Sequence, residues 1–235
     1  MYPYFSGYGL YILFSFPALL LGFWARMKVQ NAINRFSKVR TISGLSGAVV
    51  ARRMLDNNGL NDVKIEQTHG FLSDHYDPRS KTLRLSSKVF QGNSIVSSGI
   101  AAHEAGHAIQ DSNDYLPLRF RSAMVPTVQF GSWFGPILFI IGLLLSTDFG
   151  YQISSAGIIL FALTALFAII TLPVEFDASK RAKSWLISSG LIYRDEINGV
   201  NKVLDAAALT YVAGAIQAIS TLLYYAFILL GRRRD

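Results

Sequence analysis

Two histidines four residues apart carry the strongest chemical signal in this chain. His103 and His107 lie in the run His-Glu-Ala-Gly-His, within a stretch of small and apolar residues from Ser94 to Gln110. On an α-helix this spacing places both imidazoles on one face, one turn apart. Two nitrogens placed in this way can bind one zinc ion, each at roughly 2.0–2.1 Å. The run therefore predicts a metal site on a helix.

Glu104, which follows the first histidine, completes a pattern typical of amide hydrolysis. Its carboxylate could take a proton from a water on the metal without being a ligand, and pass that proton to the leaving amine. Zinc would lower the pKa of this water toward about 7. The alternative is a helix with two incidental histidines, but buried histidines and a glutamate are costly without a partner. Gly106 costs a helix about 1 kcal/mol relative to Ala, so we expect another element to approach it closely.

The third metal ligand must be a histidine or a carboxylate, because the chain has no cysteine. We expect Glu175, which stands two residues past an apolar stretch ending at Pro173. Asp177 is the competing candidate. The alternative for Glu175 is an ion pair with Lys180 or Arg181.

Other polar residues are weaker candidates for the site. His75 could donate a hydrogen bond to a transition-state oxyanion, although we favour a loop histidine packed on a turn. Arg181 and Tyr193 are further candidates for that role. The segment Leu83 to Leu85 could be an edge strand that pairs with an extended peptide.

The composition indicates a membrane protein. The chain is 51% hydrophobic and 16% charged, whereas soluble domains carry about 25% charged residues. Spans need about 20 apolar residues, and four uncharged stretches are candidates: about Tyr8 to Trp24, Val125 to Ser146, Ile153 to Pro173 and Ala206 to Leu230. The net charge of +7 fits basic residues beside spans better than nucleic-acid binding.

The distribution of basic residues predicts an orientation. Residues 26–121 hold fourteen of the 22 Lys and Arg, residues 174–205 hold five, and the loop Thr147 to Gln152 holds none. Basic segments stay in the cytoplasm, so we expect both large segments inside, with the loop and the N-terminus outside. Four full spans would place Arg232 to Arg234 outside, against this bias.

The polar region shows a mixture of short elements. Ser43 to Leu55 is predicted to be a helix with Ser43 as its N-cap. Alternating apolar and polar residues predict short strands at Asp62 to Gln67 and Thr82 to Ser86. Asp77-Pro78-Arg79-Ser80 between them is predicted to be a turn.

Three motifs connect the chain to a known family: Asp-His-Tyr-Asp-Pro-Arg at 74–79, Ala-Ala-His-Glu-Ala-Gly-His-Ala-Ile-Gln at 101–110 and Pro-Val-Glu-Phe-Asp-Ala at 173–178. They resemble the bacterial YugP family of neutral zinc metallopeptidases over nearly the whole chain. The chain is more distantly similar to HtpX-like and CAAX-prenyl endopeptidases, which place membrane helices between the histidine helix and a glutamate ligand. The resemblance implies His103, His107 and Glu175 as ligands and Glu104 as general base.

The chain departs from those distant relatives at one position. They place an aspartate four residues after the ligand glutamate, where Ser179 stands here. The acid that would orient a ligand histidine is therefore either Asp177 or missing.

We therefore expect a mainly α membrane protein with about four transmembrane helices and a zincin-like α+β catalytic domain containing a short β-sheet. The expected segments are a membrane anchor at 1–25, a cytoplasmic catalytic region at 26–123, a transmembrane hairpin at 124–173, the third-ligand helix and a cytoplasmic segment at 174–205, and a C-terminal membrane helix with a basic tail at 206–235.

The expected function is a zinc-dependent endopeptidase of the cell membrane, multi-pass, with its active site on the cytoplasmic face. Its expected partners are protein or peptide substrates and the lipid bilayer, without nucleic acid. The alternatives are a non-catalytic zinc-binding membrane scaffold and an intramembrane protease of the site-2 type. Against the latter, the histidine helix between Asn93 and Asp111 is too short to cross a membrane.

Overall fold

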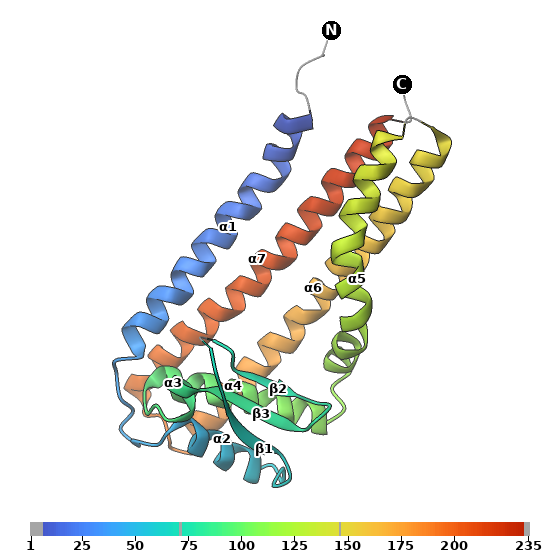
Figure 1. Cartoon of the computed structure of the whole chain (residues 1–235). Coiled ribbons are helices and arrows are strands. Elements are labelled where there is room, and N and C mark those ends of the chain that lie inside the picture. Colours follow the sequence, from blue (N-terminus) through green and yellow to red (C-terminus); the bar gives the residue numbers. More distant parts are fainter. Residues whose placement is uncertain (1–6, 71, 146, 233–235) are drawn as a thin grey trace. The chain divides into compact units, whose positions relative to one another are not determined.

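The protein is a chain of long helices with one small sheet, as the computed structural model shows (Figure 1). The structure describes residues 7–70, 72–145 and 147–232. Its elements are α1 (Gly7–Phe36), α2 (Gly47–Asp56), β1 (Lys64–Thr68), β2 (His75–Asp77), β3 (Thr82–Ser86), α3 (Ser87–Phe90), α4 (Ile95–Ser112), α5 (Leu116–Leu144), α6 (Asp148–Ser188) and α7 (Arg194–Arg232). The expected fold class, mainly α with a short β-sheet, is confirmed.

The chain forms two compact units. Residues 1–25, 120–172 and 210–235 form one, the apolar unit, and residues 26–119 and 173–209 form the other, the site unit. The helices α1, α5, α6 and α7 contribute residues to both. In the described part of the chain, these four helices are long and apolar enough to cross a membrane, by length and composition alone. The expected number of candidate spans is therefore confirmed, whereas the finer predicted division into five segments stays a prediction.

Glycines allow α5 and α6 to approach closely within the apolar unit. A Cβ atom on Gly135 would lie 3.0 Å from the carbonyl oxygen of Gly157, and one on Gly157 would lie 2.6 Å from that of Gly135. Ser154 also donates a hydrogen bond to the Phe139 carbonyl at 3.1 Å. Small residues and hydroxyl groups of this kind hold helices together in lipid, where burial of apolar surface gives no driving force. The Phe139 ring stacks on Tyr225 of α7 at 4.2 Å between centroids.

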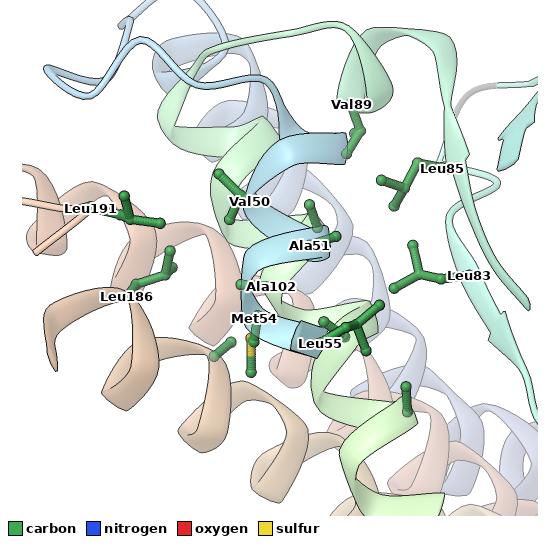
Figure 2. Close-up of a cluster of buried hydrophobic side chains, with 14 of the residues drawn as sticks. Val50, Ala51, Met54, Leu55, Leu83, Leu85, Val89, Ala102, Leu186 and Leu191 are labelled. Carbon is green, nitrogen blue, oxygen red and sulfur yellow. The ribbon is translucent and has the colours of Figure 1, made fainter. Parts of the chain in front are cut away.

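The site unit is built around a core to which α2, β3, α4 and the end of α6 contribute (Figure 2). Val50, Ala51, Met54 and Leu55 of α2 are all fully buried, and their spacing is that of one helix face. In Figure 2 this face lies between leucines of β3 and those at positions 186 and 191. The core therefore packs α4 and the end of α6 together within the site unit.

The three-stranded sheet has the order β1-β3-β2. Strand β1 pairs with β3 in parallel, with Lys64 opposite Thr82, and β2 pairs with β3 in antiparallel fashion, with His75 opposite Arg84. The expectation that the strand Leu83 to Leu85 is a free edge is therefore wrong, because both of its edges are occupied. Its two leucines are fully buried, as suits a central strand. The prediction of a loop at His75 is also wrong, because β2 is a three-residue strand, too short to show an alternating pattern.

Two predicted helix starts also differ from the structure. Helix α2 begins after Ser46, whose side chain accepts from the Val49 backbone N–H, whereas Ser43 hydrogen-bonds to the hydroxyl of Thr41. The predicted loop from 147 to 152 is largely helical, since α6 begins at Asp148. In that turn Thr147 accepts the Gly150 N–H at 3.1 Å, which is N-cap chemistry.

Gly106 of α4 provides the close contact that brings α6 to the histidine helix. A Cβ atom there would lie 2.8 Å from the carbonyl oxygen and 3.2 Å from the Cα of Ala178. Neither backbone atom can move without moving the whole helix. The expected close approach at Gly106 is confirmed, and it explains why a helix-weakening residue stands between two candidate ligands.

We expect Gly106→Ala to destabilise the protein although alanine is the better helix former. The clash should cost about 1–3 kcal/mol, which exceeds the gain of roughly 1 kcal/mol in helix propensity. Thermal unfolding of the purified protein in detergent measures the balance. Gly214→Ala in α7 is the matched control, because a Cβ there meets nothing within 4 Å. A Gly106→Ala midpoint at or above that of the control would contradict the close contact.

Candidate metal centre

Helix α4 holds both histidines in fixed register. It begins after Ser94, whose Oγ accepts the Ser97 N–H at 3.1 Å, and runs for 18 residues. Because the histidines are four residues apart within it, their rings lie together, with centroids 4.8 Å apart and planes at 85°. The His103 and His107 side chains are 14% and 9% exposed, so both imidazoles are largely buried.

Helix α6 brings Glu175 to the two imidazoles. Its Oε2 lies 3.2 Å from Nε2 of His103 and 3.7 Å from Nε2 of His107. The three potential ligand atoms all lie within 4.8 Å of one another. Tetrahedral zinc with bonds of roughly 2.0–2.1 Å requires ligand atoms about 3.3 Å apart. The three side chains therefore fit zinc with modest adjustment, and they leave a fourth position for a water molecule or substrate.

Each histidine has a second partner at the nitrogen that faces away from Glu175. Ser179 Oγ lies 3.1 Å from Nδ1 of His103, and Gln110 Oε1 lies 3.0 Å from Nδ1 of His107. Ser179, at the position where the distant relatives have an acid, thus contacts a histidine itself. Gln110 was missed in the sequence, although its place three residues after His107 puts it on the same helix face.

The structure places the remaining predicted residues as follows. Asp177 accepts from Gln110 Nε2 at 2.8 Å and pairs with Arg181 at 2.5 Å, and it does not belong to the three-residue metal group. Arg181 therefore pairs with Asp177 rather than Glu175. His75 is exposed on β2, with Nδ1 2.8 Å from the Ser73 carbonyl oxygen. Tyr193 is half exposed.

The surroundings of His107 are strongly acidic. Burial would lower the pKa of its imidazole, but the Glu175 carboxylate and the negative charges of Glu104 and Glu175 outweigh burial and raise that pKa above its ordinary value. Glu104, the proposed base, is itself buried on α4. A site with this charge favours a cation, whether a proton or a metal ion. Metal binding must therefore compete with protonation of the His107 imidazole.

The group formed by His103, His107 and Glu175 could hold a metal ion, and comparison with known families points to zinc. A family model described as "Putative neutral zinc metallopeptidase" matches residues 11–230. The chain belongs to this family.

Among curated proteins, the "Putative membrane protease YugP" of Bacillus subtilis (strain 168) is 47% identical over 226 residues. The match covers 96% of this chain and 99% of that protein. No solved structure matches the chain significantly. The family description implies zinc, and the group formed by His103, His107 and Glu175 could bind it; the role of each residue stays a prediction.

We expect Glu175→Ala to lose zinc, because it removes one of three donors. The loss of affinity should exceed the roughly 10- to 100-fold typical of an outer-shell partner, and competition with a chelator measures it. Glu66→Ala is the control, since Glu66 lies on β1 and pairs with Arg84 at 3.3 Å. A Glu175→Ala variant with full zinc affinity would move the third ligand elsewhere.

Proposed function

We propose that this protein is a zinc-dependent endopeptidase of the cell membrane that hydrolyses peptide bonds. The observation that carries the proposal is the convergence of His103 and His107 Nε2 with Glu175 Oε2. Closed structural zinc sites use four protein ligands, whereas catalytic sites use three and keep one position open. Three ligands beside Glu104 favour catalysis over the alternative of a non-catalytic scaffold.

Each residue of the site has a separate task in this mechanism. Zinc, when bound, supplies Lewis acidity that polarises the peptide carbonyl and makes water nucleophilic near neutral pH. Glu104 accepts a proton from the attacking water as its oxygen bonds to the carbonyl carbon. The carbon–nitrogen bond then breaks, and Glu104 gives the proton to the departing amine. The two histidines and Glu175 would hold the metal and would exchange no proton during the reaction.

The continuity of α6 supports membrane-associated substrates. Glu175 stands on the same uninterrupted helix as the apolar stretch from Ile153 to Pro173. The proposed substrates are therefore membrane proteins or their juxtamembrane segments. The Lys and Arg distribution supports a cytoplasmic active site.

Glu104→Gln separates catalysis from metal binding. We expect this variant to bind zinc like the parent protein and to lose activity by roughly 10²–10⁴-fold, the usual contribution of a positioned general base. Zinc content and cleavage of an unfolded protein substrate are measured on the same preparation. Glu175→Ala should lose both properties. Parent-like cleavage by Glu104→Gln would remove Glu104 as the base.

Single cysteines test the proposed orientation, because the chain has none of its own. We expect Gln152→Cys, near the start of α6, to react with a membrane-impermeant maleimide on intact cells. Lys64→Cys on exposed β1 should react only after lysis. The reverse pattern would invert the orientation and put the site outside.

A further inference from the structure

Gln110 is the most deeply buried polar side chain beside the candidate metal centre, and its amide makes three hydrogen bonds. It has no exposed surface. Its Oε1 lies 3.0 Å from His107 Nδ1, and its Nε2 donates to the Val174 carbonyl and to Asp177 Oδ2, both at 2.8 Å. We propose that Gln110 is a positioning residue of the metal centre, which fixes the tautomer of His107 and ties that histidine to the backbone beside Glu175. The proposal rests on the proposed function.

The hydrogen-bond partners allow only one orientation of the Gln110 amide. The Val174 carbonyl and the Asp177 carboxylate are acceptors, so each needs one of the two protons on Nε2. The carbonyl Oε1 therefore faces His107 and can only accept. Nδ1 of His107 must then carry the proton, which leaves the lone pair on Nε2 directed to the metal site. The side chain thus presents the nitrogen that lies 3.7 Å from Glu175.

The contact with His103 does not impose the same constraint. Its partner at Nδ1 is the Ser179 hydroxyl, which can either donate or accept. Ser179 therefore accommodates both tautomers, whereas Gln110 accommodates one. The contact with Gln110 therefore fixes the tautomer of His107, whereas the contact with Ser179 leaves the tautomer of His103 open.

Gln110 also joins the two helices that carry the ligands. It stands on α4, and both of its acceptors stand on α6, one residue before and two residues after Glu175. Arg181, one turn further along α6, pairs with Asp177 and holds its carboxylate in place. Asp177 therefore acts on His107 through Gln110 rather than by direct contact, which gives the acid predicted near the ligands a specific place.

A set of four variants tests this arrangement. Gln110→Met removes both the acceptor for His107 and the donor to the two α6 acceptors, at similar side-chain volume. Gln110→Glu keeps the acceptor for His107 but sets a carboxylate against Asp177 and the Val174 carbonyl. Asp177→Asn, combined with Gln110→Glu, returns a donor opposite that carboxylate and restores the net charge. Gln67→Met on β1 is the matched control, because that amide bonds to Ser87 and Gln91.

Three properties are measured in detergent for each variant: zinc affinity by chelator competition, the visible absorption of the Co²⁺ form, and thermal unfolding without metal. We expect Gln110→Met and Gln110→Glu to weaken zinc binding by roughly 10- to 100-fold and to change the cobalt bands. The combination of Gln110→Glu with Asp177→Asn should recover part of the zinc affinity and of the cobalt bands, since the Val174 carbonyl still faces a carboxylate, and Gln67→Met should match the parent protein.

The outcomes separate this inference from the proposed function. Parent-like affinity and cobalt bands in Gln110→Met would overturn the inference, and so would weaker binding with unchanged bands and a matching loss of metal-free stability. A parent protein that binds zinc without cleaving peptides would overturn the proposed function alone. The zinc affinities of the variants would then still support the positioning role of Gln110. A parent protein that binds no zinc would overturn both.

Discussion

The packing of α4 against α6 at Gly106 is the constraint on which the candidate metal centre depends. Only a residue without a side chain lets the backbone of Ala178 approach this closely, and this contact lies between the two histidines in sequence. Glu175 and Ser179 on α6 then face them. Burial of a carboxylate is costly without partners, but both imidazoles lie beside Glu175 here, and a bound metal ion would add to this compensation. A small relative shift of the two helices would separate the charges that make burial tolerable.

The rest of the site unit keeps this contact rigid. The core of α2 and β3 packs around α4, and leucines near the end of α6 join the same cluster. Tyr76 of β2 donates to Asp111 near the end of α4 at 2.9 Å, which ties the sheet to the histidine helix. Metal sites require their ligands to be held by packed neighbours, and these elements provide that support to the candidate ligands on α4 and α6.

Features encoded locally in the sequence were predictable, and features that depend on distant partners were not. The four-residue spacing of the histidines predicted that they share a helix face, and alternating apolar and polar residues predicted the strand Thr82 to Ser86. The place of Gln110 three residues after His107 indicates only a shared helix face, and its bond to Asp177 could not be predicted because that residue lies 67 positions away. The central place of β3 was missed for the same reason: strand order depends on pairing, not composition. Ser43 and Ser46 fit the same local N-cap pattern, so the sequence alone could not show that Ser46 caps α2.

The distance in sequence between the ligands also governs when the site can exist. His103 and Glu175 are 72 residues apart, and most of α5 and α6 is made between them. A ribosome adds about 5–20 residues per second, so the histidine helix precedes its third donor by roughly 4–14 s. During that interval the nascent chain has two imidazoles but no complete set of ligands. The candidate ligand set is therefore complete only after α5 and most of α6 have been synthesised, so any hydrolysis that depends on the metal would begin only then.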